Sequence, residues 1–197
     1  MFATGSIINN RKVEHIADGI TKVHKLYLQR GFKITHINTD CEFEPLRKEM
    51  TALCINPNCA SKMEHVPEIE RLIRTVKDPV RSAGATMTFK HISKLMIVHL
   101  VASVIFWLNA FPPSTPGVEL SYTKGPGQLI LGNTVDYKKF CRLQTGEYVQ
   151  VHQEDETRNT IAIDRTVGEI SLGPHYNLQG GYFSEILLTY KRIWRSN

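Results

Sequence analysis

Cysteine is scarce in this chain of 197 residues, and its four cysteines (Cys41, Cys54, Cys59 and Cys141) are irregularly spaced. So few irregular cysteines do not form the disulfide framework of a small secreted domain. Cys54, Cys59 and nearby His65 raise the alternative of a zinc site. No second pair of ligands follows at the spacing of a zinc finger. The sequence therefore favours ordinary buried or surface thiols over zinc.

Long apolar runs are also lacking. The most apolar stretch covers residues 95–108 and contains His99 and Ser103. Its length is that of a buried helix and is too short for a membrane span. The first twenty residues contain no apolar segment of the length found in a signal peptide. We therefore expect a soluble intracellular protein without a membrane partner, located in the nucleus if it acts on DNA.

Charge is distributed unevenly along the chain. The formal net charge is +5, with 24 Lys and Arg against 19 Asp and Glu. Residues 1–94 hold 15 basic and 10 acidic side chains, and residues 95–197 hold 9 of each, so the excess lies in the first half. A basic half suits a polyanionic partner, and a generally solvated basic surface would give the same count.

The first half reads as alternating helices and strands. Apolar residues at helical spacing predict a helix from Val13 to about Arg30, with Gly31 as its end. Further segments are predicted as a short strand (2–8), a strand flanked on both faces (32–38), a short helix (43–50), a turn-rich passage (56–58) and a long helix (92–109). A helix beginning at Pro67 should end or kink near Lys77, because Pro79 removes a backbone donor.

The second half differs from the first in composition and in predicted secondary structure. Prolines and glycines crowd residues 112–127, which predicts an irregular connection. Lys124-Gly125-Pro126-Gly127 lacks the pattern of a phosphate-binding loop and is expected to be a turn. Short β-like pieces follow at 147–152, 161–163, 167–172, 181–183 and 191–194. Such pieces divided by turns indicate a small barrel.

Two carboxylates are the candidate metal ligands of the first half. Asp40 follows the predicted strand at 32–38, at the end where open α/β sheets usually place their sites. Glu70 lies on the basic helix that begins at Pro67. Hard divalent cations prefer oxygen ligands, and phosphoryl transfer needs metal to neutralise its charge. The pair therefore points to Mg²⁺ or Mn²⁺ held against a phosphate backbone. If both residues are structural, Glu68 and Glu70 are first-turn acids favoured by the helix dipole.

Several motifs in order resemble the integrases of copia-type long-terminal-repeat retrotransposons. They are Arg30-Gly31-Phe32, Asp40-Cys41-Glu42-Phe43, Glu64-His65-Val66-Pro67-Glu68-Ile69-Glu70-Arg71, Phe106-Trp107-Leu108-Asn109-Ala110-Phe111-Pro112 and Gly180-Gly181-Tyr182-Phe183. The resemblance runs over nearly the whole chain. It implies a partial RNase H-like α/β core at residues 1–112, a connection at 113–136 and an SH3-like β-barrel at 137–197.

The same resemblance implies DNA integration by two aspartates and a glutamate that bind two Mg²⁺ ions. Asp40 takes the place of the second aspartate. Glu68 and Glu70 both stand near the place of the glutamate, and Glu70 is preferred because Glu70-Arg71-x-x-Arg74 matches the family's Glu-Arg-x-x-Arg run. The interval from Asp40 to Glu70 is shorter than the one that the family usually shows. No strand carrying the first aspartate precedes these residues, so we expect no strand transfer by this polypeptide alone.

Basic side chains are the expected DNA contacts. For those on the helix that begins at Pro67, the alternative is a solvated helix face that pairs with local acids. The expected contacts are Arg71, Arg74, Lys77 and Arg81, together with Lys191, Arg192 and Arg195 beside Trp194. DNA is the expected partner, with homo-oligomerisation open and no small-molecule substrate expected. The second hypothesis is a non-enzymatic DNA-binding or partner-binding remnant of a retrotransposon polyprotein. His99, on the apolar helix, is expected to be a hydrogen-bonded core residue and not a catalyst.

Overall fold

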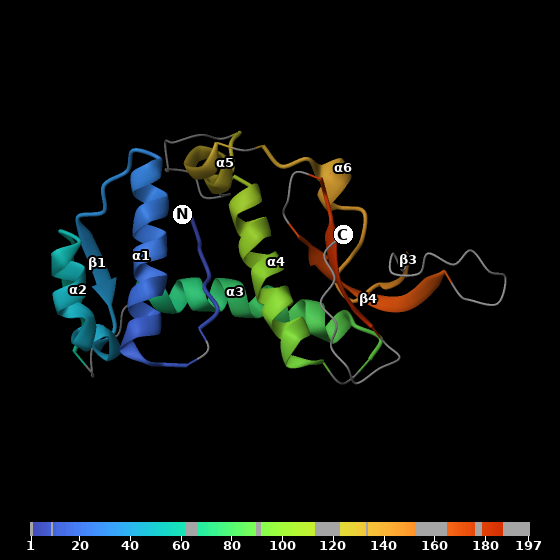
Figure 1. The fold of residues 1–197 in the computed structure, drawn as a ribbon, viewed down its shortest axis with the longest axis horizontal. Helices are drawn as coiled ribbons and strands as arrows, with labels where there is room; N and C mark the ends of the chain where they lie inside the picture. Colours follow the sequence, from blue (N-terminus) through green and yellow to red (C-terminus); the bar gives the residue numbers. More distant parts are fainter. Residues whose placement is uncertain are drawn as a thin grey trace. The chain divides into compact units, whose positions relative to one another are not determined.

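The computed structural model describes residues 2–8, 10–61, 67–89, 92–112, 123–132, 134–152, 165–175 and 179–186. The chain divides into two compact units. The first comprises residues 1–79 and 105–133, and the second comprises residues 80–104 and 134–197. Two helices, α3 (Pro67–Thr86) and α4 (Lys94–Ala110), contribute residues to both units (Figure 1).

Helix α1 (Val13–Gln29) covers the small core of the first unit. Its partly buried Ile16 and Ile20 pack against a cluster of buried Leu46, Met50 and Ile55. The helix ends where the sequence predicts, because Gly31 has a positive φ of 79° and donates its N–H to Leu28 at 3.0 Å. Only glycine adopts this backbone conformation without strain.

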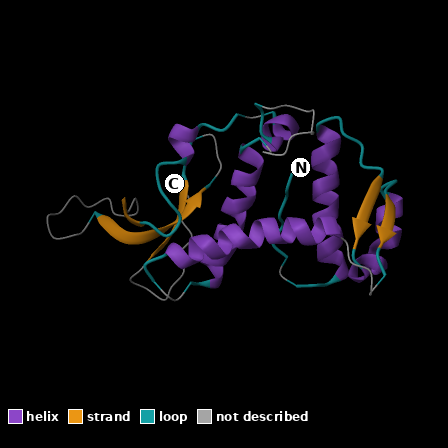
Figure 2. Cartoon of the chain, turned by 180° about the vertical axis from the view of Figure 1, so that it is seen from behind, coloured by secondary structure: helices purple, strands orange, loops and turns teal. Residues whose placement is uncertain are grey.

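Two short parallel strands, β1 (His36–Thr39) and β2 (Asn56–Cys59), form the sheet of the first unit, and Figure 2 shows it in orange. The 3₁₀-helix η1 (Cys41–Leu46) and helix α2 (Arg47–Ala52) connect them, as the predicted short helix indicated. The strand predicted at 32–38 is therefore shorter and begins later than expected.

The prediction of a turn at 56–58 is wrong, because these residues belong to β2. Asn56 and Ala60 donate their N–H groups to Thr35 and Thr39 of the neighbouring strand at 2.9 and 2.8 Å. Successive residues of a strand point their N–H groups to opposite edges. The nitrogen of Pro57 therefore points away from β1, where its missing hydrogen removes no bond of this pair.

Residues 2–8 were expected to form a strand, and the structure shows them without regular secondary structure. Ala3 is nevertheless buried. Its N–H donates to Oδ1 of Asn109 at 2.8 Å, and its carbonyl accepts from Nδ2 of Asn109 at 2.6 Å. A side chain thus supplies the hydrogen bonds that a neighbouring strand would have given.

Helix α3 continues through Pro79 to Thr86, so the helix does not end near Lys77, and the predicted alternative of a kink there stays a prediction. Proline leaves the carbonyl four residues earlier without its helical donor. Pro79 is exposed, and no residue of α3 is buried. Water can therefore hydrate the freed carbonyl, which lowers the penalty for continuing the helix.

The long apolar helix is confirmed as α4, whose Met96, Leu100 and Ser103 are buried. Among the helices that the structure describes, none is long and apolar enough to cross a bilayer.

The expected turn at Lys124-Gly125-Pro126-Gly127 is instead the start of helix α5 (Pro126–Leu131). Gly125 takes the N-cap position with an extended backbone, and Pro126 opens the first turn. Proline is favoured there because the first helical N–H groups have no intrahelical partner. Helix α5 therefore begins in the last two residues of the interval predicted to be irregular, and residues 113–122 of that interval lie outside the described residues.

Helix α6 (Tyr137–Phe140) precedes the sheet of the second unit. Strands β3 (Tyr148–His152), β4 (Thr166–Pro174) and β5 (Tyr182–Ile186) pair antiparallel in the order β3-β4-β5 (Figure 2). They confirm the strands predicted at 147–152, 167–172 and 181–183. The pieces predicted at 161–163 and 191–194 lie outside the described residues. The described strands form an open three-stranded sheet, and closure into a barrel is not shown.

Candidate functional site

Asp40 follows β1 directly and caps the next element. Its backbone is extended, and its Oδ1 accepts the N–H of Cys41 at 2.7 Å, which starts η1. The side chain is exposed. The preceding Thr39 pairs with Cys59 across the two strands, so Asp40 lies at the carboxyl edge shared by β1 and β2. The sequence predicted this position correctly.

A second carboxylate at this edge was missed by the sequence analysis. Glu44 of η1 accepts two bonds from Arg47, Nε at 2.6 Å and Nη2 at 2.8 Å. The Arg47 guanidinium, followed by a hydrogen bond from the Cys59 thiol, lowers the pKa of Glu44 to about 2. Cys59 in turn accepts the hydroxyl of Thr39 at 3.2 Å. Glu44 is thus ionised, but its charge is already paired with Arg47.

The spacing of Glu44 and Arg47 was the available signal for this pair. Residues three apart on a helical segment are neighbours, so an acid and an arginine at that interval pair readily. The link to Cys59 had no such signal, because it depends on the pairing of β1 with β2.

Glu70 lies in the first turn of α3 and is exposed. With 3.6 residues per turn, Glu70, Arg74, Lys77 and Arg81 fall within about 60° of the helix circumference, whereas Glu68 lies about 160° from Glu70. The helix therefore groups Glu70, and not Glu68, with these cations. Arg71 lies about 100° from Glu70 by the same geometry. Residues 62–66, including His65, lie outside the described residues.

The donor set limits what metal these residues could hold. The described part of the chain contains no group of three or more His, Cys, Asp or Glu side chains arranged for a metal ion. Mg²⁺ takes six oxygen ligands, and two metals ordinarily share a bridging carboxylate. That Asp40 and Glu70 share one weakly held ion, with water or phosphate completing its shell, stays a prediction. They do not fit a pair of ions.

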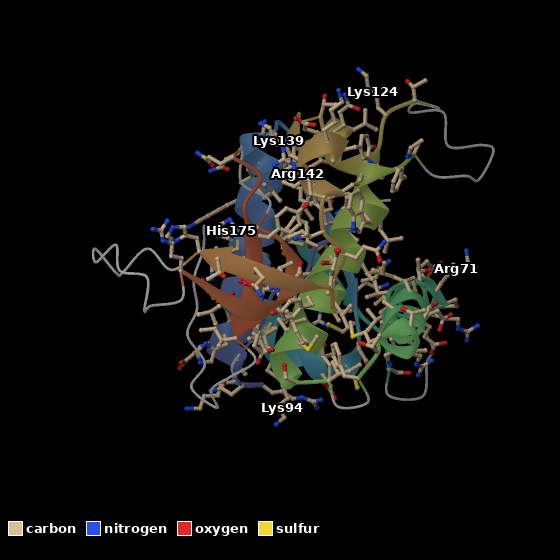
Figure 3. The ribbon with its side chains drawn as sticks, turned by 90° about the vertical axis from the view of Figure 1, so that its right-hand side faces the viewer. Arg71, Lys94, Lys124, Lys139, Arg142 and His175 are labelled. Atoms are coloured by element: carbon tan, nitrogen blue, oxygen red, sulfur yellow. The ribbon has the colours of Figure 1, made fainter. Side chains whose placement is uncertain are left out.

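All four predicted basic residues of α3 are exposed, namely Arg71, Arg74, Lys77 and Arg81. Figure 3 looks nearly along this helix and shows its side chains, Arg71 among them, projecting outward. Arg81 belongs to the second unit, and the other three belong to the first. Lys191, Arg192, Trp194 and Arg195 lie outside the described residues.

A basic cluster that the sequence analysis missed lies at α6, and it consists of Lys138, Lys139 and Arg142. Nε of Arg142 donates to the carbonyl of Lys138 at 3.1 Å. The hydroxyl of Tyr182 on β5 accepts the N–H of Arg142 at 2.9 Å and donates to the carbonyl of Lys139 at 2.8 Å. Figure 3 shows Lys139 and Arg142 near one another. Tyr182 therefore fixes the backbone that carries these cations.

His99 packs against an aromatic ring of the second unit, and its prediction as a hydrogen-bonded core residue stays a prediction. It is half-buried, and its ring centroid lies 4.8 Å from that of Phe183. Burial lowers the pKa of His99, and the charge of Glu185 acts in the opposite direction. A neutral ring in an aromatic contact fits packing better than catalysis.

Comparison with known proteins gives a distant likeness to integrases. Neither a protein-family model nor a curated protein sequence matches the chain. The catalytic core domain of BIV integrase aligns with a TM-score of 0.41 and 16% identity, over 64% of this chain and 76% of that one. A simian T-cell lymphotropic virus intasome, solved with a PP2A regulatory subunit, aligns with a TM-score of 0.44 and 12% identity.

The intasome alignment covers 96% of this chain but 63% of the other, so this chain spans less than two thirds of that protein. Similarity at these scores does not assign the chain to a family. The architecture is mixed α/β with a distant structural similarity to retroviral integrases. Its relation to copia-type elements is a proposal.

Proposed function

We propose that this chain is an integrase-derived DNA-binding protein, of copia-type retrotransposon ancestry, that does not perform strand transfer alone. One observation carries the proposal. Asp40 lies at the carboxyl edge of a parallel strand pair, and the next long helix, α3, presents Glu70 with exposed Arg74 and Lys77 on one face. The quoted sequence motifs support the ancestry.

DNA would be held through its phosphates. Exposed arginines and lysines on one helix face give sequence-independent attraction to a polyanion. A single Mg²⁺ shared by Asp40 and Glu70 would neutralise phosphate charge at the same place. Because the carboxylates do not fit a two-metal centre, we derive no phosphoryl-transfer step.

A two-metal centre needs a third carboxylate, and the described residues show no such group of three. This favours the non-enzymatic hypothesis over an active enzyme. Glu42 and Glu44 both follow Asp40 in η1, and the bidentate bond of Glu44 to Arg47 occupies both oxygens of Glu44. Release of that carboxylate would leave Arg47 without its partner. The described residues therefore offer groups for binding DNA, and among them no third carboxylate joins Asp40 and Glu70 in a metal-binding group.

Fluorescence anisotropy with a labelled DNA duplex tests the binding. Raising the salt concentration from about 50 to 200 mM should weaken binding by orders of magnitude if several phosphates are contacted. Replacing both Arg74 and Lys77 with alanine should lower the slope of log affinity against log salt by about 0.9 per lost contact. Lys48→Ala, an exposed lysine on α2, is the matched control. An affinity independent of salt, or an unchanged slope in the double variant, contradicts the proposal.

The metal is tested separately by thermal melting in MgCl₂ or MnCl₂ at constant ionic strength. The wild-type melting temperature should rise because the ion binds the folded state. Asp40→Asn and Glu70→Gln should abolish this rise, and Glu68→Gln should not. Asparagine also caps helices, so Asp40→Asn preserves the start of η1. A rise that persists in Asp40→Asn argues against the site.

A further inference from the structure

The face of β4 and β5 that carries Glu169 contains an unusual group of buried oxygens. Glu169 is 3% exposed and Ser171 is 0% exposed. The hydroxyl of Ser184 donates to Oε2 of Glu169. The Oγ of Ser171 is buried and has no hydrogen-bond partner among the residues that the structure describes. Buried polar groups are normally paired, so this arrangement calls for an explanation.

The strand register brings the three side chains together. Ser171 lies directly opposite Ser184 in the antiparallel pair, so their side chains share one face. Glu169 precedes Ser171 by two residues along β4, which places it on the same face. The carboxylate and both hydroxyls therefore lie on the same face of the sheet, and Ser184 is already bonded to Glu169.

The backbone does not supply the missing partner. The N–H of Ser171 donates to Glu147 at 2.8 Å, and its carbonyl accepts from Gly146 at 2.7 Å. Both main-chain groups are thus satisfied by the turn before β3. The unmet demand comes from the side chains, namely the Ser171 hydroxyl and the charge of Glu169. Leaving a carboxylate buried with one hydroxyl donor is energetically costly.

We propose that Glu169, Ser171 and Ser184 bind one small monovalent cation of sodium size. All three donors are oxygens, which suit a hard ion. One carboxylate and two neutral hydroxyls balance a single positive charge, whereas a divalent ion would leave a net charge buried. A water molecule would satisfy the Ser171 hydroxyl without neutralising Glu169. The site is separate from Asp40 and Glu70 and does not depend on the proposed function.

Thermal melting of the whole chain in different chloride salts tests the site. At a fixed ionic strength of about 150 mM, screening by NaCl, KCl and tetramethylammonium chloride is similar, so differences report specific binding. The melting temperature should be highest in NaCl and lowest with tetramethylammonium, which is too large for a buried site. The gain should grow with sodium concentration as expected for a ligand of the folded state.

Three variants make the test specific. Glu169→Gln keeps the shape of the side chain and removes its charge, so it should eliminate the preference for sodium. Ser171→Ala should reduce the preference, and Ser82→Ala, an exposed serine on α3, should leave it unchanged. Sodium NMR of the wild-type protein gives a second measurement that does not depend on folding of the variants. The sodium line should broaden in the presence of protein and narrow when KCl is added.

Equal melting temperatures in the three salts, together with no line broadening, would overturn the proposal. A sodium preference that survives in Glu169→Gln would do the same. If Glu169→Gln is more stable than wild type and neither protein distinguishes the salts, Glu169 is accommodated without an ion and the inference is wrong.

Discussion

The side-chain amide of Asn109 on α4 pairs with both backbone groups of Ala3. The two hydrogen bonds are 2.8 and 2.6 Å long and join residues 106 positions apart in the sequence. An amide side chain has a donor and an acceptor in the same arrangement as a peptide group. Asn109 therefore holds the first residues in place of a neighbouring strand.

Asn109→Ala should lower the free energy of unfolding by about 1–3 kcal/mol, because it leaves the buried N–H and C=O of Ala3 unpaired. Asn109→Asp should also destabilise, since a carboxylate accepts from the Ala3 N–H but repels its carbonyl. Denaturant unfolding measures both changes. Gln29→Ala, on the exposed end of α1, serves as the control and should change stability by less than about 0.5 kcal/mol. Equal stability of Asn109→Ala and this control would refute the pairing.

Proline should be tolerated at position 57 and not at position 58. The N–H of residue 58 points toward β1, since Asn56 and Ala60 on either side donate in that direction. Asn58→Pro should therefore cost about 1–3 kcal/mol or more by leaving a strand carbonyl unpaired. Asn58→Ala removes the exposed 3.2 Å bond to Asn38 and should have a small effect. Urea unfolding of Asn58→Pro and Asn58→Ala measures this difference in stability. Similar unfolding midpoints would mean that the pairing of β1 with β2 is wrong.

His99 should make stability depend on pH. Burial lowers the pKa of His99 below its ordinary value of 6.5. The unfolded chain therefore binds the proton more readily, so this stabilisation is complete above pH 6.5 and is lost as the pH falls toward the lower pKa of the folded state. His99→Gln should flatten the pH dependence of the unfolding free energy relative to wild type. Parallel pH curves for wild type and His99→Gln would count against the assignment.

Two glycines with positive φ should respond differently to alanine. At Gly31, φ is 79° and an added Cβ meets open space, so Gly31→Ala should cost about 1–2 kcal/mol from backbone strain alone. At Gly173, φ is 113° and the added Cβ would lie 2.7 Å from Oγ of Ser103. Gly173→Ala should therefore lower the melting temperature more than Gly31→Ala does. The opposite order would show that Ser103 does not pack against Gly173.

The elements that the sequence predicted well are those with a local signal. Helix α1 follows its apolar spacing and ends at Gly31, and α4 follows its continuous apolar run. The missed elements have local signals that point the other way. Strand β2 contains a proline between two asparagines, and α5 begins with Gly125 and Pro126. For both elements, contacts with other segments of the chain outweighed the turn propensity of these residues.

The residues of the candidate site also fall into those that a local sequence signal indicated and those that it did not. A carboxylate after a strand placed Asp40 correctly, and helix periodicity grouped Glu70 with Arg74 and Lys77. Sequence patterns did not reveal that Tyr182 holds the backbone of Lys139 and Arg142, because these residues are about forty positions apart. They also did not reveal the group of buried Glu169 and Ser171 with half-buried Ser184, because alternation along a strand does not say which face is covered.

The sequence by itself determined the long helices, most of the strands and the basic first half, because periodicity and charge act between near neighbours. Tertiary structure alone decided which strands pair and which polar groups are buried. Glu44 shows both levels. Its pairing with Arg47 is local, three residues along the chain, but the Cys59 thiol reaches its carboxylate only because β1 pairs with β2. The surroundings of a polar group therefore depend in part on distant segments, and these are fixed only when the chain packs.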